Sequence, residues 1–103
     1  MSSVSLIVLN YNGEAVILDC LRAIDAQSFR NFELIIVDNG SKDRSLVLIA
    51  DFKRKTTLKI VYLEDNKGFS GGNIEGLKYA NGKHIALLNN DTIVDIPNIN
   101  NKN

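Results

Sequence analysis

The chain has 103 residues and carries twelve basic and twelve acidic side chains, so its formal net charge is zero. This length suits one domain with a hydrophobic core, and the balanced charge gives no electrostatic basis for a nucleic-acid partner or an anionic membrane surface. The single cysteine, Cys20, excludes an internal disulfide and fits a reducing compartment. No segment approaches the roughly 18 apolar residues of a membrane span, and no basic region opens a secretory signal. We therefore expect a cytoplasmic protein without membrane insertion, and a peripheral position at the inner membrane face stays open.

Four apolar runs alternate with three segments of helical spacing. The runs over residues 4–9, 32–37, 58–63 and 84–88 predict strands. Between them, apolar residues recur three and four positions apart, which predicts helices. These residues are Val16, Ile17, Cys20, Leu21 and Ile24 in the first helix (14–27), Leu46, Ile49 and Phe52 in the second, and Ile74, Leu77 and Ala80 in the third. Because the connections are too long for hairpins, the alternation predicts an α/β three-layer sandwich with a mostly parallel, Rossmann-like sheet of four strands.

A glycine-rich turn, residues 66–73, joins the third predicted strand to the third helix. Its glycines allow a sharp turn and a close backbone approach. Ser70 is expected to cap the helix, and the free N–H groups of the next turn would favour an anion such as phosphate. A turn of this composition that binds nothing fits the residues equally well. Ser41 is expected to cap the second helix, with Asp43 in its first turn.

Each predicted strand ends in a cluster of polar residues. The clusters are Asn10-Tyr11-Asn12, Asp38-Asn39, Glu64-Asp65-Asn66-Lys67 and Asn89-Asn90-Asp91. In a parallel sheet these ends lie along one edge, where open α/β sheets bind ligands. The alternative is that strand ends need turn and cap residues, for which Asn, Asp, Ser and Gly are the usual choices.

Three side chains within these clusters have a specific chemical use. The carboxylate of Asp38 could accept a hydrogen bond from a nucleobase N–H, although Asp-Asn-Gly-Ser is also a plain turn. Asp91 offers hard oxygen ligands to a divalent cation that also holds phosphate oxygens. Tyr11 could stack on a base or cover the edge of the sheet.

These motifs, in this order and spacing, resemble the nucleotide-sugar-binding half of family 2 glycosyltransferases, in their rhamnosyltransferase-like variant. The likeness runs from about Val4 to Asp95 and includes residues 4–8, 11–12, 36–43, 66–68, 71–73, Gly76 and 87–91. Members of this family are inverting enzymes with a GT-A fold. The resemblance implies a nucleotide-sugar-binding domain over residues 1–95. The tail over residues 96–103 is rich in asparagine and contains Pro97, a composition that cannot build a core, so we expect it to be irregular.

The resemblance also implies roles for individual residues. Asn12 and Asp38 would hold the nucleobase and its ribose, and Lys67 would lie near the phosphates. Gly68, Gly72 and Asn73 would bring the third helix against the nucleotide and sugar. The family's Asp-x-Asp motif falls on residues 89–91, so that Asp91 would bind Mn²⁺ or Mg²⁺ and Asn89 stands where the family has its first acid. The full set implied to bind the nucleotide sugar is Asn10, Tyr11, Asn12, Asp38, Asn39, Lys67, Gly68, Gly72, Asn73, Asn89 and Asn90.

An inverting transferase also needs a carboxylate that deprotonates the acceptor hydroxyl. In the family this base lies well downstream of the metal motif, so we expect it beyond residue 103 and assign no catalytic residue within the chain. A UDP- or dTDP-linked sugar is the expected ligand, and a homodimer or a partner chain is expected to cover the exposed fourth strand and an apolar helix face. The alternative function is a non-catalytic nucleotide-binding module that works through such assembly. A receiver-like or flavodoxin-like domain is disfavoured, because those folds place their chemistry after the first and third strands.

Overall fold

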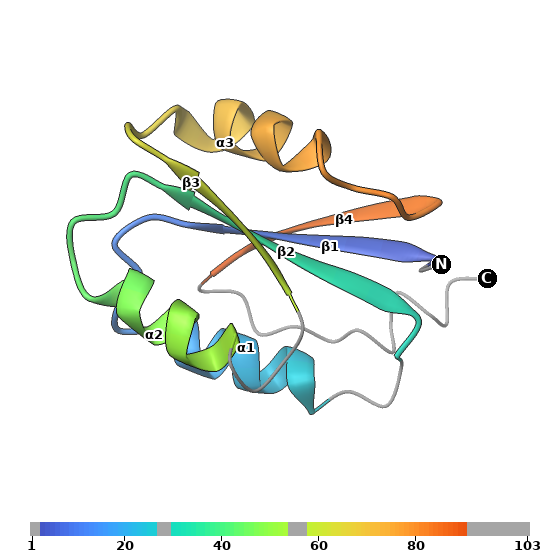
Figure 1. Cartoon of the computed structure of the whole chain (residues 1–103), viewed down its shortest axis with the longest axis horizontal. Coiled ribbons are helices and arrows are strands. Elements are labelled where there is room, and N and C mark those ends of the chain that lie inside the picture. Colours follow the sequence, from blue (N-terminus) through green and yellow to red (C-terminus); the bar gives the residue numbers. More distant parts are fainter. Residues whose placement is uncertain (1–2, 27–29, 54–57, 91–103) are drawn as a thin grey trace.

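The structure, a computed structural model, describes residues 3–26, 30–53 and 58–90. Strands and helices alternate along the chain: β1 (Val4–Asn10), α1 (Ile17–Asp25), β2 (Phe32–Asn39), α2 (Ser45–Lys53), β3 (Lys59–Leu63), α3 (Gly68–Leu77) and β4 (His84–Asn89). The strand order is β3-β2-β1-β4, and all three pairings are parallel. Helices α1 and α2 cover one face of the sheet and α3 covers the other (Figure 1). The three-layer α/β architecture predicted from the alternation is thereby confirmed.

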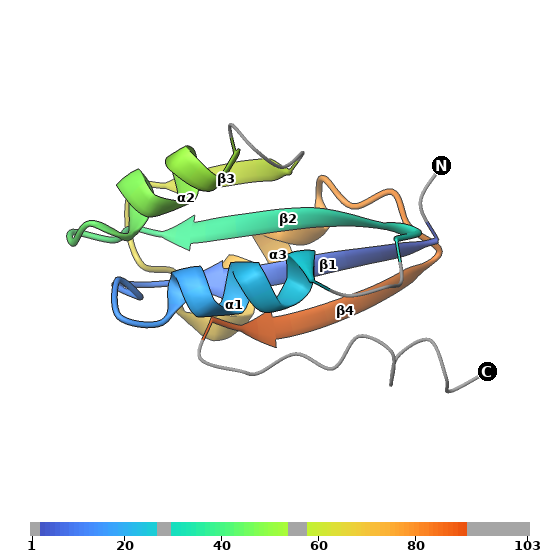
Figure 2. The same cartoon turned by 90° about the horizontal axis from the view of Figure 1, so that it is seen from below.

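The two central strands carry the core. Every residue of β1 is buried, and six of the eight residues of β2 are buried as well. Alternate side chains of these strands feed two apolar clusters, one beneath α1 and α2 and a smaller one beneath α3. Figure 2, which shows the sheet from the side of α1 and α2, has both helices lying along the strands. Cys20 belongs to the larger cluster, as its place on the apolar face of the first predicted helix indicated.

The second helix begins later than predicted. Ser41 was expected to cap it, but α2 begins at Ser45. The carboxylate of Asp43 fills the capping role instead, because its Oδ1 accepts a hydrogen bond of 2.9 Å from the Ser45 N–H. The first helix is also shorter than predicted, with Ile17 rather than Glu14 as its first residue.

The third helix turns a different face to the sheet from the one predicted. Ile74 is 55% exposed and Leu77 is 42% exposed, whereas Gly72 and Gly76 are buried. A Cβ on Gly76 would lie only 2.7 Å from Val37 Cγ2 and 2.8 Å from Ile7 Cγ2. Because only a glycine fits at that distance, the helix packs on the sheet through its glycines and leaves its large apolar side chains outside. Ser70 lies inside α3, which begins at Gly68, so the predicted cap at Ser70 was wrong.

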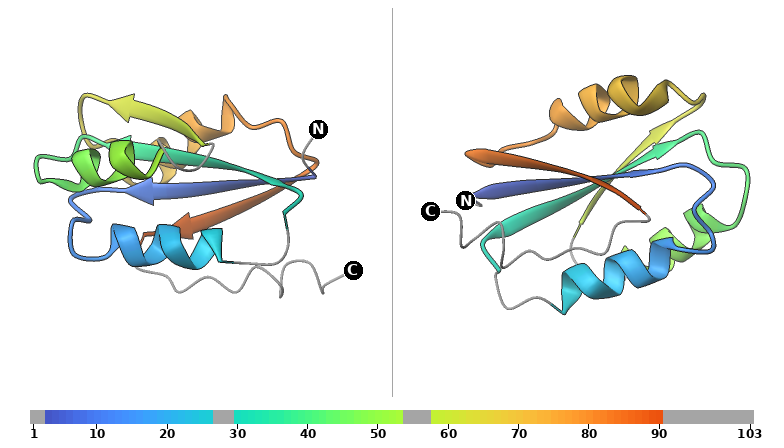
Figure 3. Two further views of the ribbon diagram at one scale, coloured as in Figure 1. Left: turned by 60° about the horizontal axis from the view of Figure 1, so that its bottom comes forward. Right: turned by 180° about the vertical axis from the view of Figure 1, so that it is seen from behind.

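A polar cluster ties the opposite, amino-terminal edge of the sheet together. Glu33 Oε2 accepts hydrogen bonds from Ser5 Oγ and from the Asn81 N–H, and its Oε1 lies 3.1 Å from Lys59 Nζ. Burial raises the pKa of the Glu33 carboxyl. The hydrogen bonds and the charge of Lys59 lower this pKa by more than burial raises it, so that it lies below its ordinary value. The cluster anchors the connection between α3 and β4, which Figure 3 shows from two further directions.

Candidate functional site

The carboxyl ends of the four strands meet at one edge of the sheet. The register aligns Asn10 of β1 with Asp38 of β2, and Leu9 with Asn89 of β4. Asn39 of β2 aligns with Leu63, the last residue of β3. The polar side chains that follow the strands in the sequence are therefore neighbours in space, as the parallel topology predicted.

Asn10 is the centre of a buried hydrogen-bond network at this edge. Its Nδ2 donates to Asp38 Oδ1 at 2.9 Å, to Ser45 Oγ at 3.0 Å and to Ser41 Oγ at 3.2 Å. Its Oδ1 accepts a hydrogen bond of 2.8 Å from Asn90 Nδ2. Asn10 is 0% exposed and Asp38 is 1% exposed. One amide thus joins β1, the turn after β2, the start of α2 and the end of β4.

The loops after β1 and β2 are fastened to each other. Asp38 accepts hydrogen bonds at Oδ1 from Ser41 Oγ (2.7 Å) and at Oδ2 from the Ser41 N–H (3.0 Å). The Asn12 N–H donates to Ser41 Oγ at 2.8 Å, and Asn12 Oδ1 accepts from the Lys42 N–H at 2.7 Å. Asn12 has a left-handed φ of 49°, a conformation that asparagine tolerates better than most residues. Tyr11, which precedes Asn12, is 47% exposed and forms part of the outer surface.

Asn39 fixes the glycine-rich turn in the same way. Its Nδ2 donates to the Gly68 carbonyl at 3.0 Å, and its Oδ1 accepts from the Lys67 N–H at 2.8 Å. Gly68 has a φ of 76°, and its N–H donates to Asn66 Oδ1 at 2.7 Å. The first turn of α3 therefore starts in a defined direction at the carboxyl edge. The N–H groups that follow Gly68 lack intrahelical partners, as at any helix start, and are available to an anion.

Asn73 has a buried amide whose hydrogen bonds are unsatisfied. The residue is 4% exposed, and both its Nδ2 and its Oδ1 are buried without a partner in the structure. Lys59 Nζ of β3 donates a hydrogen bond to the Tyr79 carbonyl, just beyond the end of α3. The side of the helix on which Tyr79 lies therefore faces β3. With about 100° per residue along a helix, Asn73 lies on the other side of Gly76, toward β1 and β4.

Three residues of the site were missed by the sequence prediction. Ser45 was not predicted to take part, and Ser41 was considered only as a helix cap. Gly13 is needed because a Cβ there would collide with Asn90 Nδ2 and Asn10 Oδ1. The only available signal was the recurrence of small residues just after the strands. That signal does not reveal which of them reaches a partner from another strand.

Asp43 holds the start of α2 against the loop after β1. Besides capping Ser45, its Oδ2 accepts a hydrogen bond of 2.9 Å from the Glu14 N–H. Burial raises the pKa of the Asp43 carboxyl, but the hydrogen bonds from Ser45 and Glu14 lower it more, and the resulting pKa lies below its ordinary value. At neutral pH Asp43 is therefore an anion whose hydrogen bonds hold the start of α2 against the loop after β1.

The predicted metal ligand, Asp91, lies outside the described residues. Within residues 3–26, 30–53 and 58–90, no group of three or more His, Cys, Asp or Glu side chains is arranged to hold a metal. Asn89 is exposed at the end of β4, and Asn90 is half-buried. No helix in the described part of the chain could cross a membrane. The predicted boundary between the domain and the tail, at residue 95, also falls outside the described residues.

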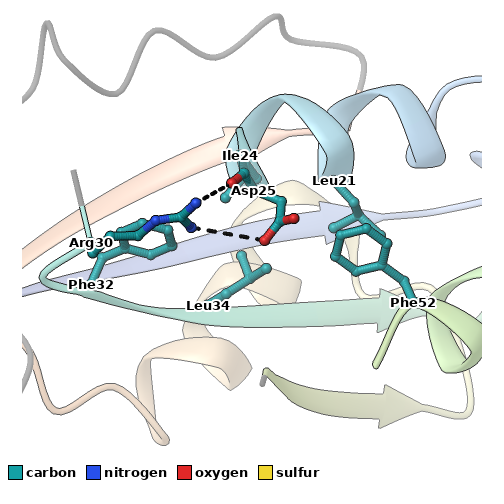
Figure 4. A pocket seen from close by; sticks show the side chains of 7 residues that line it. All are labelled: Leu21, Ile24, Asp25, Arg30, Phe32, Leu34 and Phe52. Carbon is teal, nitrogen blue, oxygen red and sulfur yellow. Dashed lines mark hydrogen bonds and ion pairs between the residues drawn. The ribbon is translucent and has the colours of Figure 1, made fainter. Parts of the chain in front are cut away.

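An apolar pocket of about 180 Å³ lies elsewhere, between α1, α2 and the first half of β2 (Figure 4). Its mouth carries an ion pair in which Arg30 Nη1 lies 3.8 Å from Asp25 Oδ1. The lining residues are Leu21, Ile24, Asp25, Arg30, Phe32, Leu34 and Phe52. Phe32 and Leu34 lie at the amino end of β2, whereas the polar network gathers at its carboxyl end. The pocket is therefore separate from the candidate site.

The sequence matches the family described as Glycosyl transferase family 2 over residues 5–100. This chain belongs to that family. It is 30% identical over 95 residues to the poly-beta-1,6-N-acetyl-D-glucosamine synthase of Staphylococcus epidermidis, covering 92% of this chain and 23% of that protein. It is 33% identical over 90 residues to the Escherichia coli UDP-Glc:alpha-D-GlcNAc-diphosphoundecaprenol beta-1,3-glucosyltransferase WfgD, covering 87% of this chain and 35% of that protein.

Solved structures share the fold of this family 2 chain. The crystal structure of S. aureus TarS 1–349 in complex with UDP-GlcNAc matches with a TM-score of 0.86 and 30% identity, covering 97% of this chain and 29% of TarS 1–349. A Pyrobaculum calidifontis mannosyltransferase in complex with GDP-Man and Mn²⁺ matches with a TM-score of 0.80 over 86% of this chain and 27% of its own, and at 23% identity it shows the fold alone. The resemblance to family 2 and the fold class expected from it are confirmed. The chain spans 23% and 35% of the length of the two relatives and 29% and 27% of the two solved chains.

Proposed function

We propose that this chain is the nucleotide-sugar-binding part of an inverting glycosyltransferase and holds its ligand at the carboxyl edge of the sheet with a divalent cation. The likeness to TarS, which was crystallised with UDP-GlcNAc, supports a nucleoside-diphosphate sugar as the ligand. The unsatisfied amide of Asn73 is the observation on this chain that carries the proposal. UDP- and dTDP-linked sugars are the expected ligands.

A buried amide without hydrogen-bond partners costs about 1–3 kcal/mol. A sugar hydroxyl or a ribose hydroxyl both donates and accepts, so it can satisfy both atoms of the Asn73 amide. The start of α3 lies on the same helix one turn earlier, where its free N–H groups and the exposed Lys67 suit the diphosphate. The Asn73 amide thus suits a hydroxyl group of a nucleotide sugar, and the neighbouring start of α3 suits its diphosphate.

The remaining predicted residues fall into two groups in this proposal. Tyr11, Asn12 and Asp38 lie on the side of β1 and β2, where we expect the nucleobase. Asn10 and Asn39 are buried and hold the loops that form the walls of the site. The direct contact between Asp38 and the base stays a prediction, because the carboxylate already accepts hydrogen bonds from Asn10 and Ser41.

The cation would be held by Asp91, with Asn89 and Asn90 beside it. Carboxylate and amide oxygens are ligands that Mg²⁺ and Mn²⁺ accept, although an amide at residue 89 brings less charge than a carboxylate would. Such a cation would stabilise the charge that develops on the leaving nucleoside diphosphate. Asn90, which precedes Asp91 in the sequence, donates a hydrogen bond to Asn10 at the carboxyl edge of the sheet.

Transfer to an acceptor would need more protein than residues 1–103. The relatives are about three to four times as long as the part they share with this chain, and we expect the catalytic base and the acceptor pocket to come from further polypeptide, a second copy or a partner chain. The E. coli relative is named for a diphosphoundecaprenol acceptor. An acceptor of that kind supports a cytoplasmic protein that works at the inner face of the membrane.

Thermal melting of the purified chain with UDP, dTDP, GDP and ADP, each with and without Mn²⁺, tests the proposal. A ligand at about 100 times its dissociation constant stabilises the folded state by about 2.7 kcal/mol, so UDP or dTDP should raise the melting temperature, and more so with Mn²⁺. No rise with any nucleotide overturns the proposed function. Binding without any hydrolysis or transfer, even when a polypeptide with an acceptor pocket and a catalytic base is supplied, supports the alternative of a non-catalytic module.

An Asn73→Leu variant tests the observation that carries the proposal. Without ligand it should melt higher than the wild type, because an unsatisfied amide has been replaced by an apolar group of similar size. It should also lose most of the nucleotide-dependent rise. Asn81→Leu makes the same chemical change at an exposed position near the opposite edge of the sheet, and it should leave the rise intact. Equal nucleotide binding by Asn73→Leu and the wild type would show that Asn73 does not face the ligand.

A further inference from the structure

The hydroxyl of Ser41 joins the loop after β1 to the loop after β2. Its Oγ accepts hydrogen bonds from the Asn12 N–H at 2.8 Å and from Asn10 Nδ2 at 3.2 Å, and it donates one to Asp38 Oδ1 at 2.7 Å. A serine hydroxyl has one donor and two acceptor positions. These three bonds therefore use its whole capacity within the protein, and Ser41 can affect a ligand only through the groups that it holds.

One of these groups is the carboxylate of Asp38. Besides the bond from its hydroxyl, Ser41 donates its backbone N–H to Asp38 Oδ2 at 3.0 Å, so that both carboxylate oxygens are held by one residue. Hydrogen bonds to a carboxylate are roughly twice as strong as those between neutral groups. The carboxylate cannot rotate unless these bonds break, and Ser41 thus fixes its direction at the end of β2.

The other group is the backbone at Tyr11. The N–H of Asn12 belongs to the planar peptide group that joins Tyr11 to Asn12, so the hydrogen bond to Ser41 Oγ fixes the backbone directly after Tyr11. A second bond holds the same loop, because Asn12 Oδ1 accepts from the Lys42 N–H at 2.7 Å. The distance between the backbone at Tyr11 and the carboxylate of Asp38 is therefore set through one hydroxyl group.

We propose that Ser41 is a positioning residue for the nucleobase of the nucleotide sugar and acts by holding the loop with Tyr11 at a fixed distance from Asp38. This inference rests on the proposed function, in which the nucleobase lies on this side of β1 and β2. A site whose walls are ordered before binding loses no binding free energy to ordering them. Removal of the hydroxyl should therefore weaken nucleotide binding, although Ser41 itself contacts no ligand.

Calorimetric titration of the full 103-residue chain with UDP and Mn²⁺ tests the proposal. Ser41→Ala removes the hydroxyl and should weaken UDP binding about tenfold. Ser41→Thr keeps a hydroxyl and should bind UDP within about twofold of the wild type. Without ligand, the Asn12 amide should exchange hydrogen faster in Ser41→Ala than in the wild type, because it has lost its acceptor, and Ser41→Thr should restore the slow exchange. Circular dichroism checks that each variant is folded.

Ser5→Ala is the matched control, because it removes a buried, hydrogen-bonded hydroxyl at the opposite edge of the sheet. Ser5 Oγ donates to Glu33 Oε2 and accepts from the Gly82 N–H at 2.8 Å. The variant should melt at a lower temperature than the wild type but bind UDP equally well. A loss of UDP binding that Ser5→Ala shares to the same extent overturns the proposal, because reduced stability would then explain it.

The remaining outcomes separate this inference from the proposed function. A wild-type chain that binds no nucleotide overturns the proposed function and this inference with it. A wild-type chain that binds UDP, with Ser41→Ala binding it equally well, overturns this inference alone. Weak binding that Ser41→Thr does not restore also overturns this inference alone, because the effect would then not come from the hydroxyl.

Discussion

Asn10→Asp is the variant that most directly tests the buried network at the carboxyl edge. The change is nearly isosteric, but it replaces an amide N–H₂ that donates to Asp38 Oδ1 at 2.9 Å with a second carboxylate oxygen. Both residues are almost fully buried, at 0% and 1% exposure. Two carboxyl groups that share such a site cannot both ionise, and the pKa of one of them should rise by about 3 units. At about 1.36 kcal/mol per unit, the variant should lose about 4 kcal/mol of unfolding free energy at neutral pH.

The pH dependence of this variant gives a sharper test than its stability at one pH. A carboxyl group whose folded pKa lies above its unfolded pKa destabilises the protein at high pH and stops doing so as the pH falls through the folded value. As the pH is lowered from about 7.5 to about 5, the unfolding free energy of Asn10→Asp should therefore rise relative to that of the wild type. Urea unfolding at both values measures this difference, provided that both transitions are two-state.

Asn89→Asp is the control for Asn10→Asp. It adds the same charge at the same edge of the sheet, but at an exposed residue, and in the absence of metal it should change stability by less than about 0.5 kcal/mol. If Asn10→Asp lowers the unfolding free energy at pH 7.5 by no more than Asn89→Asp does, Asn10 and Asp38 are not in buried contact. The account of Asp38 as part of the site's framework would then be wrong.

Further predictions concern three other positions. Gly76→Ala should lower the unfolding free energy by about 1–2 kcal/mol, because overpacking against the sheet outweighs the gain in helix propensity; an unchanged or raised urea midpoint would contradict the glycine-mediated packing. Since the pKa of Glu33 is lowered in the folded state, it stabilises the protein above its unfolded pKa and loses this effect as the pH falls below about 5. Glu33→Gln should therefore be less stable at pH 7 and show a flatter loss of stability toward acid, as thermal melts at several pH values would reveal. Asn39→Ala releases the glycine-rich turn, so it should weaken nucleotide binding in calorimetry while the sheet stays folded by circular dichroism.

The architecture follows from the sequence because its signals are local. Buried parallel strands give continuous apolar runs, and helices repeat their apolar residues every three to four positions. Once the strands are parallel, their carboxyl ends must share an edge, and this brings Asn10, Asp38, Asn39 and Asn89 together as predicted. The motifs at these ends were sufficient to recognise glycosyl transferase family 2, which the match over residues 5–100 confirms.

The tertiary structure decided which side chains face which. Helical spacing assigned Ile74 and Leu77 of α3 to the core, but the close approach of α3 to β1 and β2 leaves room only for hydrogen atoms, so Gly72 and Gly76 form the contact. A polar residue at a strand end can point to a ligand or to a partner on the next strand, and no local pattern distinguishes the two. Asn10 and Asp38 point to each other because the register of β1 and β2 places them side by side. That choice depends on contacts between residues 28 positions apart, which sequence periodicity does not record.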